Sequence, residues 1–409
     1  MQFHEIFAGK KILICASASI AIYKILDLIS TLKKSQASIK VTLTPDAQKF
    51  LTPLCFEALT HTTVLCENSE SWDSQCNHIA YAKWADIILI APASANTIAK
   101  IASGIADNVL LATILASPAK KLIAPAMNTQ MLDAKQTQDN LAKLQASGYT
   151  IIPTRTSLLA CDTHGDGALA ENFEILSHLA RAFCTSSPLG KFWQGKRVII
   201  TGGGSKEAID SVRCISNHSS GLQASALCLG LFFYGAEVHF ISSAFPTPLP
   251  QGIFCIEAQS AKEYHQALQE LTKSHQESFL FMAAAIADFK PKNPVPGKIK
   301  KQDKEELWIA CEKNLDILQN LQSPNLIKIG FKAESDPSSA LDSAKKMLIE
   351  KQCLCVCLNI LSHQNSFGAL HNEMTLINSH VTKTIPLNSK FHIADKILEF
   401  VAQTLQTHP

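Results

Sequence analysis

The sequence predicts an α/β protein with two domains, each built around a largely parallel β-sheet. Three observations lead to this class. Short apolar runs, typical of buried strands, alternate with segments of helical period along the whole chain. Most of the predicted strands end in a short turn of small or polar residues. A segment rich in Ser, Pro and Gly, residues 186–194, interrupts the pattern, so we expect domains over residues 1–185 and 195–409 joined by this linker.

The composition limits the kind of partner. The chain has 409 residues, of which 46% are hydrophobic and 18% charged, and its formal net charge is +2. This balance argues against a broad nucleic-acid-binding surface. The 13 cysteines are scattered without a C-x-x-C pair and the start is not signal-like, which indicates reduced thiols in the cytoplasm. No apolar run approaches the roughly 20 residues that a membrane helix needs, so we expect neither nucleic acid nor membrane as a partner.

The first half repeats a strand–turn–helix unit. Residues 10–19 are an apolar run that ends in small residues, and residues 20–34 carry apolar side chains at helical spacing with lysines in the last turn. Residues 38–51 repeat the scheme of strand, turn and helix. Further strands are expected over residues 87–92, 120–128 and 148–153. Alternation of this kind predicts a doubly wound parallel sheet.

Four of these strands end in short loops of polar or small residues, which are Ser17–Ser19, Thr44–Asp46, Ser94–Thr97 and Met127–Asn128. Ligands of open α/β sheets bind outside the carboxyl ends of the strands. The free N–H groups at a helix start also suit an anion. The four loops could therefore surround one planar cofactor that carries a phosphate.

The second half restarts the pattern after the linker. Strands are expected over residues 195–204, 236–242, 279–289, 325–335 and 353–360, followed by a C-terminal helix. Residues 290–304 contain six lysines and three prolines without helical or strand period. We interpret this segment as a mobile basic loop.

Several motifs are ambiguous when each is taken alone. The TGGG run at 201–204 is either a tight turn or a phosphate-binding loop. Cys353, Cys355 and Cys357 alternate with apolar residues, which favours one face of a buried strand over a metal site. His78 and Cys161 carry no functional claim by themselves.

In combination, the motifs resemble a known family. In the first half these are IAIYK (20–24), HIAYAKWAD (78–86), APASANTIAK (91–100), PAMNTQM (125–131) and LACDTHGDG (159–167). In the second half they are TGGGSKEAID (201–210), VRCISNHSSG (212–221), AAAIADFKP (283–291), KIKKQ (298–302), NLDIL (314–318) and GFKAES (330–335). Their order over nearly the full chain is similar to that of the bifunctional bacterial coenzyme A biosynthesis family. That family joins a phosphopantothenoylcysteine decarboxylase to a phosphopantothenate–cysteine ligase.

For residues 1–185 the resemblance implies a flavodoxin-like sheet and an FMN-dependent decarboxylase. A flavin would take a hydride from the thiol-bearing carbon, so that carbon dioxide can leave from a position β to a C=S group. His78 would be the active-site histidine that helps form the thiolate. Asn128 would bind the substrate, and Cys161, on a mobile flap, would return a proton. The residues matched to FMN binding are Ser17, Ser19, Thr44, Ser94, Asn96 and Thr97.

For residues 195–409 the resemblance implies a Rossmann-like ligase domain that uses CTP and Mg²⁺. Asn217 would stabilise an acyl-cytidylate intermediate, and Lys298, on the basic loop acting as a lid, would neutralise phosphate charge. Asp288 would help to hold nucleotide and Mg²⁺. The substrate-binding residues would be Asn128, Arg213, Asn217, Ser219 and Ser220. The residues matched to CTP binding are Met282, Ala283, Ala284, Asp288, Lys298, Asn314, Leu315, Asp316, Ile317, Phe331, Lys346 and Lys351.

The chain departs from the family pattern at several positions. Ala18 stands in a loop that is usually glycine-rich, and Ala168-Leu169 replace an Arg-Met pair of the flap. SNHSSG is followed by Leu222-Gln223-Ala224 in place of Lys-Met-Gly, and Met347 appears where a lysine is usual. We therefore expect a divergent cytoplasmic member of the family. It would use CTP to join cysteine to 4′-phosphopantothenate and would then convert the product, 4′-phosphopantothenoylcysteine, into 4′-phosphopantetheine.

The resemblance further implies self-association through both domains. Three alternatives remain at this stage. The first is an active flavin decarboxylase with a decayed ligase half. The second is a related flavin decarboxylase that acts on C-terminal cysteines of peptides, which the SNHSSG half disfavours. The third is a non-enzymatic flavin-binding regulatory protein, which His78, Asn128 and Cys161 together disfavour.

Overall fold

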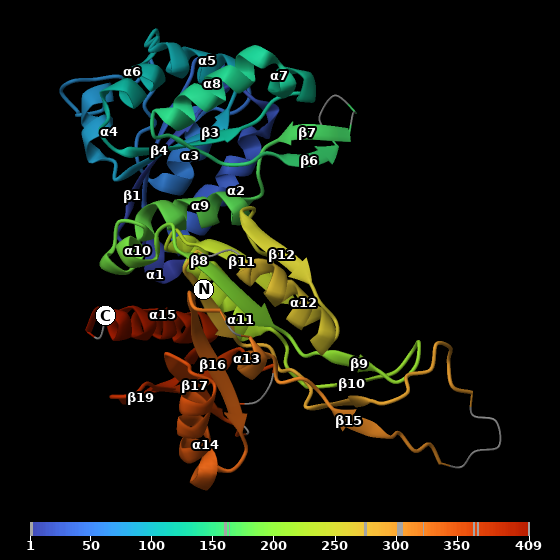
Figure 1. Ribbon diagram of the computed structural model, residues 1–409. Coiled ribbons are helices and arrows are strands. Elements are labelled where there is room, and N and C mark those ends of the chain that lie inside the picture. Colours follow the sequence, from blue (N-terminus) through green and yellow to red (C-terminus); the bar gives the residue numbers. More distant parts are fainter. Residues whose placement is uncertain are drawn as a thin grey trace. The chain divides into compact units, whose positions relative to one another are not determined.

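The computed structural model describes residues 3–158, 162, 164–273, 276–300, 306–321, 323–362, 365 and 368–407. The chain divides into two compact units, Met1–Phe183 and Cys184–Pro409. Each unit combines a β-sheet with helices (Figure 1), so the predicted α/β class is confirmed. Within the described residues, no helix is long and apolar enough to cross a membrane.

The first unit is a five-stranded sheet in the order β2-β1-β3-β4-β5, and each neighbouring pair runs parallel. The chain leaves β1 first toward β2 and then continues on the other side with β3, so the strand order reverses at the β1/β3 boundary. The strands are β1 (Lys11–Ala16), β2 (Ser38–Leu43), β3 (Ile87–Ala93), β4 (Lys120–Pro125), β5 (Thr150–Ile151), β6 (Arg155–Leu158) and β7 (His164–Ala168). The α-helices are α1 (His4–Phe7), α2 (Lys24–Lys34), α3 (Pro53–Thr60), α4 (His78–Trp84), α5 (Ala95–Ser103), α6 (Val109–Ala116), α7 (Thr129–Asp133), α8 (Lys135–Ala146) and α9 (Asn172–Cys184), with 3-10 turns η1 (Ile20–Tyr23) and η2 (Ala47–Lys49).

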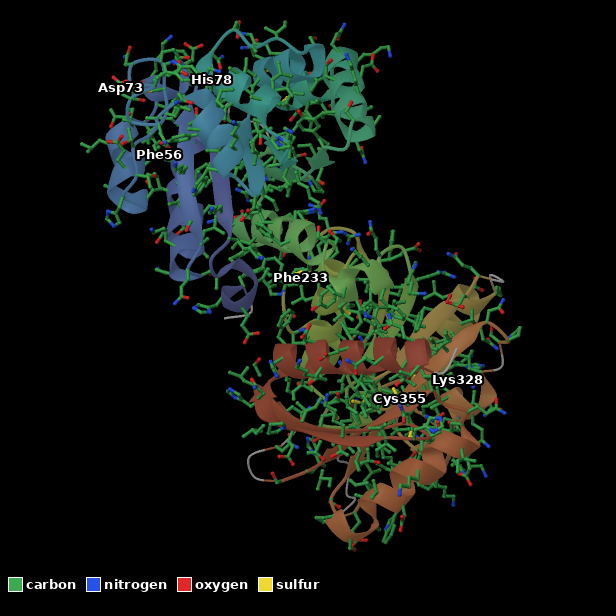
Figure 2. All side chains as sticks on the ribbon, turned by 90° about the vertical axis from the view of Figure 1, so that its left-hand side faces the viewer. Phe56, Asp73, His78, Phe233, Lys328 and Cys355 are labelled. Carbon is green, nitrogen blue, oxygen red and sulfur yellow. The ribbon has the colours of Figure 1, made fainter. Side chains whose placement is uncertain are left out.

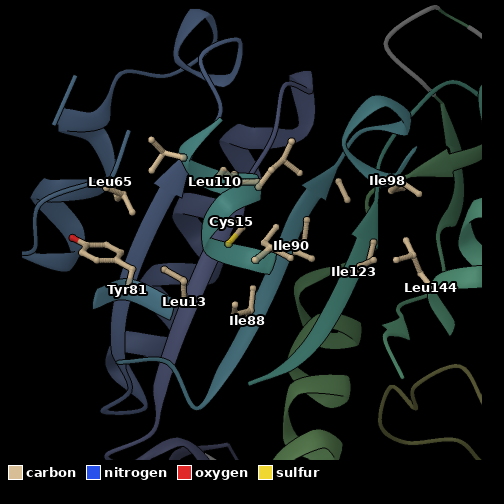
Figure 3. Packing of buried hydrophobic residues seen from close by; sticks show 14 of the residues in the cluster. Leu13, Cys15, Leu65, Tyr81, Ile88, Ile90, Ile98, Leu110, Ile123 and Leu144 are labelled. Carbon is tan, nitrogen blue, oxygen red and sulfur yellow. The ribbon is translucent and has the colours of Figure 1, made fainter. Parts of the chain in front are cut away.

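The central strands of the first unit are apolar on both faces because helices cover both sides of a doubly wound sheet. Every residue of β3 is buried. Ile88 and Ile90 of this strand pack in one cluster with Ile98 of α5 and Leu110 of α6 (Figure 3). Burial of each such side chain contributes about 1.5–3 kcal/mol. The strand ends that carry the predicted loops are therefore held by a rigid core.

The second unit is an eight-stranded sheet in the order β12-β11-β8-β13-β16-β17-β18-β19. Its first five pairings are parallel and its last two antiparallel. The strands are β8 (Arg197–Gly202), β9 (Lys206–Ala208), β10 (Cys214–Ser216), β11 (Glu237–Ser242), β12 (Ile253–Glu257), β13 (Ser278–Met282), β14 (Phe289–Pro291), β15 (Cys311–Lys313), β16 (Leu326–Glu334), β17 (Cys355–Ile360), β18 (His371–Ile377) and β19 (Thr382–Ser389). The helices are α10 (Pro188–Trp193), α11 (Leu222–Phe233), α12 (Ala261–Thr272), α13 (Ile317–Asn320), α14 (Pro337–Glu350) and α15 (Lys390–Thr407).

Three predicted strands or loops differ in the structure. The strand predicted over 279–289 ends at Met282, because the N–H of Ala284 donates to Thr201 Oγ1 (3.1 Å) and that of Ala285 to Gly203 O (2.9 Å). The basic loop 290–304 is not free of strand, since β14 pairs with β15. Its residues 301–304 lie outside the described residues. The strand predicted over 148–153 is reduced to β5.

The cysteine-rich strand is a core strand, as predicted. Cys355 and Cys357 are fully buried on β17, and Cys353 lies just before it. Burial raises the pKa of Cys353 to about 11, so its thiol stays protonated. Within the part of the chain that the structure describes, no group of three or more His, Cys, Asp or Glu side chains is arranged to hold a metal ion.

The predicted linker contains a short helix. Within residues 186–194, the hydroxyl of Ser187 accepts the N–H of Gly190 (3.0 Å) and so caps α10. Trp193 ends this helix and is fully buried. Its ring lies 5.0 Å from that of Phe192 and 5.0 Å from that of Phe279 on β13. The end of the segment is thus part of the core of the second unit.

We predict that Trp193→Ala destabilises the second unit by about 3–5 kcal/mol, because truncation of a buried tryptophan leaves a cavity lined by aromatic rings. Urea unfolding followed by tryptophan fluorescence and circular dichroism measures the loss. Trp308→Ala is the matched control, since Trp308 is 88% exposed and its loss should leave the free energy of unfolding within about 0.5 kcal/mol. Equal stability of the two variants would contradict the assignment of α10 to the core.

Candidate active sites

The first candidate site lies at the carboxyl ends of β1 and β3, where the strand order reverses. The hydroxyl of Ser17 donates to Pro92 O (2.8 Å) and accepts the N–H of Ser94 (2.8 Å). Ser94 in turn caps α5 by accepting the N–H of Thr97 (3.3 Å). An N-cap of this kind contributes about 1 kcal/mol. The two loops are therefore fixed to each other at the position where open α/β sheets bind cofactors.

The predicted FMN residues differ in accessibility. Ser17, Thr44 and Thr97 are buried, and their hydroxyl groups are hydrogen-bonded within the protein. Ser19 and Ser94 are partly exposed, and Asn96 is exposed on the first turn of α5. The buried members shape the loops, and the accessible ones, together with the start of α5, present the hydroxyl and amide groups that suit a phosphate. This donor set fits a flavin phosphate.

The alanine in the first loop causes no backbone strain. Ala18 is not among the described residues with positive φ, which are Gln36, His61, Gln75, Asp162 and Gln352 apart from the glycines. The left-handed conformation that favours glycine is therefore not needed at this position.

His78 is the first residue of α4, after Asn77, whose side chain accepts the N–H of Ala80 (2.9 Å) and caps the helix. Its Nδ1 lies 2.7 Å from Glu70 Oε1, and the Trp72 ring meets the imidazole edge-on with centroids 5.7 Å apart. Figure 2 labels His78 within the first unit. The hydrogen bond from the His78 side chain holds the pKa of Glu70 below its usual value. Sequence motifs did not indicate Glu70 or Trp72.

Asn128 caps α7, since its Oδ1 accepts the N–H of Gln130 (2.9 Å). The adjacent residues hold the hairpin of β6 and β7. Met127 N–H donates to Gly167 O (2.9 Å), and Thr129 Oγ1 donates to Asp166 O (2.6 Å). The predicted flap is thus hydrogen-bonded to the loop that carries Asn128. Cys161 lies outside the described residues.

Close contact between the two loops explains the glycines of the flap. A Cβ on Gly167 would collide with the carbonyl oxygen of Met127, and φ of Gly167 is +114°. A Cβ on Gly165 would collide with the hydroxyl of Thr129. Both positions therefore require glycine for the hairpin to lie against the Asn128 loop.

The flap retains an arginine on its other strand. Ala168 occupies the position where the family pattern has arginine, and its cross-strand partner is Arg155. Arg155 Nε donates to Leu169 O (3.1 Å), and its guanidinium forms an ion pair with Glu171 (2.6 Å). The base of the hairpin is therefore tied to the residue that precedes α9.

The second candidate site is a cavity of about 850 Å³ in the second unit. It is lined by loops that follow β13 and β15, by the start of α11, and by β16 and α14. All predicted ligase residues except Arg213 and Lys298 line it, namely Asn217, Ser219, Ser220, Met282, Ala283, Ala284, Asp288, Asn314, Leu315, Asp316, Ile317, Phe331, Lys346 and Lys351.

Hydrogen bonds hold three loops together at this cavity. Asn217 Nδ2 donates to Ala285 O (3.0 Å), and Ser205 N–H donates to the same oxygen (3.1 Å). A Cβ on Gly204 would come too close to Asn217 O, and one on Gly203 would collide with Ser243 Oγ. The space beside the glycines of TGGG is thus filled by other parts of the protein. Residues 201–204 themselves do not line the cavity. This arrangement favours the tight-turn interpretation.

Two charged residues of the cavity lining pair with each other. Asp316 caps α13 by accepting the N–H of Gln319 (3.1 Å), and its other oxygen lies 2.9 Å from Lys351 Nζ. Burial alone would raise the pKa of Asp316, but the hydrogen bonds from Lys351 and Gln319 bring it below the usual value. Asp288 is exposed, and its carbonyl accepts the N–H of Asn314 (2.7 Å).

Arg213 and Lys298 lie away from the cavity lining, next to each other on an arm of the second unit. The Arg213 guanidinium donates to Ile299 O (2.7 Å), and Asp210 Oδ2 accepts the N–H of Ile299 (3.1 Å). The arm also carries β9, β10, β14 and β15 (Figure 1). The structure therefore groups these two predicted residues but does not bring them to Asn217.

Sequence reasoning missed one group of cavity residues. Gln223, Asn372 and Lys390 line the cavity and are linked, since Gln223 donates to Lys390 O (3.1 Å) and accepts from Asn372 (3.3 Å). They come from α11, β18 and α15. The antiparallel strands β18 and β19 were not predicted, so nothing in the sequence placed Asn372 or Lys390 near SNHSSG.

The fold and sites define a two-domain α/β enzyme in which each unit has its own site. Residues 5–183 match the family model "Flavoprotein", and residues 193–405 match "DNA/pantothenate metabolism flavoprotein C-terminal domain". The chain is 35% identical over 405 residues to the coenzyme A biosynthesis bifunctional protein CoaBC of Vibrio cholerae, covering 97% of this chain and 99% of that protein. It is 35% identical over 402 residues to CoaBC of Bacillus subtilis, covering 96% and 97%. A solved C-terminal domain of CoaBC is 27% identical with a TM-score of 0.44, covering 52% of this chain and 97% of that one.

The chain belongs to the family of bifunctional coenzyme A biosynthesis proteins. This confirms the family, and the bifunctional enzyme class, that the order of motifs predicted. The residue roles implied by the resemblance and the domain boundaries inferred from the linker composition remain predictions.

We predict that Arg155→Ala loosens the flap, because it removes a charged hydrogen bond and an ion pair at the base of the hairpin. If these two interactions together stabilise the closed hairpin by about 1.4 kcal/mol, their loss makes the open form about tenfold more populated. Amide hydrogen exchange of Met127, whose N–H binds the flap, should therefore be about tenfold faster. Lys135→Ala is the control, because its ion pair with Asp139 is exposed and involves neither strand of the hairpin. An unchanged exchange rate in Arg155→Ala would refute the role of Arg155.

Proposed function

We propose that the chain catalyses two successive reactions of coenzyme A synthesis. The second unit joins cysteine to 4′-phosphopantothenate with CTP and Mg²⁺, and the first unit decarboxylates the product, 4′-phosphopantothenoylcysteine, to 4′-phosphopantetheine with FMN. The observation that carries the proposal is the 850 Å³ cavity, which gathers residues of four separate ligase motifs around Asn217 in a chain that also has the flavoprotein half.

In the first unit, the residues present suit FMN at the β1/β3 boundary, where flavodoxin-like sheets bind that cofactor. Bound there, FMN would supply a reversible two-electron oxidation of the thiol-bearing carbon, with no net redox change over the reaction. His78 takes the thiol proton of the substrate, and Asn128 binds its carboxylate and amide. Cys161 supplies the proton that completes the thiol product.

In the second unit, the substrate carboxylate attacks the α-phosphate of CTP and releases pyrophosphate, and the amine of cysteine then displaces CMP. Asn217 is held by Ala285 O so that its amide faces the loop that would carry the acyl-cytidylate. The exposed carboxylate of Asp288 supplies an oxygen ligand that suits Mg²⁺ beside a triphosphate. Lys298 is proposed to reach the phosphates from the arm when the lid closes.

We also propose that both units self-associate. Large apolar side chains exposed on each unit support this, for example Tyr23, which is 57% exposed, and Trp308, which is 88% exposed. Analytical ultracentrifugation of the full chain tests it, and a monomer at micromolar concentration would refute it.

One assay tests both proposed activities. Purified protein is incubated with phosphopantothenate, cysteine, CTP and Mg²⁺, and pyrophosphate and carbon dioxide are followed. Both products are expected. Carbon dioxide only from added phosphopantothenoylcysteine would refute the ligase, and a colourless protein that fails to bind FMN would refute the decarboxylase.

We predict that Asn217→Asp lowers the rate of pyrophosphate release by at least about 100-fold and leaves decarboxylation of supplied phosphopantothenoylcysteine unchanged. The change removes the donor to Ala285 O and places a negative charge where phosphates would bind. Arg197→Lys, on β8 outside the cavity lining, is the control and should retain both activities. Equal loss of both reactions would indicate misfolding and not a role in ligation.

A further inference from the structure

We propose that Glu70 is a positioning residue for His78, which it holds with the proton on Nδ1 so that Nε2 is free to accept the substrate proton. No motif that carries the family resemblance contains Glu70. The inference deepens the proposed decarboxylase function and rests on the role given there to His78.

One oxygen of Glu70 fixes both the ring and the backbone of His78. Glu70 Oε1 lies 2.7 Å from Nδ1 and accepts the N–H of the same histidine at 3.3 Å. Both side chains are about three-quarters buried, with exposed fractions of 26% and 28%. Because α4 begins at His78, the carboxylate also lies at the positive end of a helix, which stabilises its ionised form. The imidazole therefore has one defined orientation relative to the helix.

A second contact limits the rotation of the ring. The Trp72 indole meets the imidazole at an interplanar angle of 85° with centroids 5.7 Å apart. Trp72 itself is 66% exposed, so it contributes little to the core of the unit.

The loop that carries Glu70 is held by its own hydrogen bonds. The N–H groups of Ser69 and Glu70 both donate to Cys66 O at 3.0 Å, and Ser71 N–H donates to Cys76 O at 2.8 Å. The Ser69 hydroxyl donates to Val64 O (2.6 Å). The position of the carboxylate is thus set by the fold before substrate binds, and little conformational entropy remains to be lost.

The chemistry of the two groups defines the tautomer. An ionised carboxylate can only accept, so Nδ1 must carry a hydrogen and donate it. In the neutral imidazole the lone pair is then on Nε2. Transfer of the substrate proton breaks the S–H bond and forms an Nε2–H bond. The resulting imidazolium is stabilised by the adjacent carboxylate, and no electrons are exchanged between the two residues.

Other charges near this loop do not share the role. Asp73 is exposed on the same loop and makes no hydrogen bond or ion pair with any described residue. Glu67 accepts the N–H of Val109 at the start of α6 (3.2 Å). Figure 2 shows His78 and Asp73 at the same end of the first unit. Asp73→Asn is therefore a matched control that removes one negative charge from the loop without changing the histidine contact.

The test uses the full-length FMN-loaded protein and supplied phosphopantothenoylcysteine. We expect Glu70→Ala to lower kcat by about 10- to 100-fold, with KM within about twofold and FMN content unchanged. Glu70→Gln should lose at least about tenfold, because an amide offers both a donor and an acceptor and no longer fixes one tautomer. A side chain that only filled space would be rescued by glutamine, which has the same size. Asp73→Asn should stay within about twofold of the unmodified protein.

A double-mutant cycle with His78→Ala gives the decisive comparison. If Glu70 acts through His78, then Glu70→Ala/His78→Ala should be within about twofold of His78→Ala alone. Additive losses, or full activity of Glu70→Gln, would overturn the proposal. If His78→Ala itself kept full activity, the role of His78 in the proposed function would fail. If His78→Ala were inactive and Glu70→Ala normal, only the role of Glu70 would fail.

Discussion

In both units, polar atoms at the carboxyl edge of the parallel sheet form hydrogen bonds with a neighbouring loop, and for the fully buried hydroxyl of Ser17 this is a requirement, since water does not reach it. In the first unit the hydroxyl of Ser17 meets this requirement by joining Pro92 O to Ser94 N. In the second unit Ala285 O accepts from both Ser205 and Asn217. The loops that would contact ligands are therefore fixed by hydrogen bonds to each other. Each candidate site depends on these links more than on any single ligand-facing side chain.

The close contact between these loops also decides where the sequence requires glycine. Glycine is required where one loop lies directly against the backbone of another, as at Gly167 against Met127 and Gly204 against Asn217. It is not required at Ala18, where the backbone has no positive φ. A glycine-rich motif can thus serve loop packing, ligand approach or both. The structure separates these roles for TGGG, whose free space is taken up by Ser243 and Asn217.

Much of the fold was predictable from sequence because its signals are local. Buried strands such as β3 read as continuous apolar runs, and Ser94 was recognisable as a helix start. The misplaced end of the strand at Met282 has a physical reason, because AAAIA is as apolar as the strand before it. The strand ends there because Ala284 and Ala285 donate to Thr201 and Gly203, residues that are more than 80 positions away in the sequence. Glu70 was missed for a related reason, since its approach to His78 depends on closure of the intervening loop by Ser71 and Cys76.

The departures from the family pattern in the second unit leave several lysines in the lining of its cavity. Leu222 replaces a lysine, but Lys390 lines the same cavity next to Gln223 and forms no ion pair with the residues the structure describes. Burial lowers the pKa of Lys390, which means that an anion entering the cavity would stabilise its charged form. Lys351 differs from Lys390, because the carboxylate of Asp316 already compensates its positive charge. Five of the described lysines line the cavity, and carboxylates pair with three of them, which are Lys332, Lys346 and Lys351. The charge of Lys390 is not compensated in this way, so an anionic ligand in the cavity would gain most from an approach to that side.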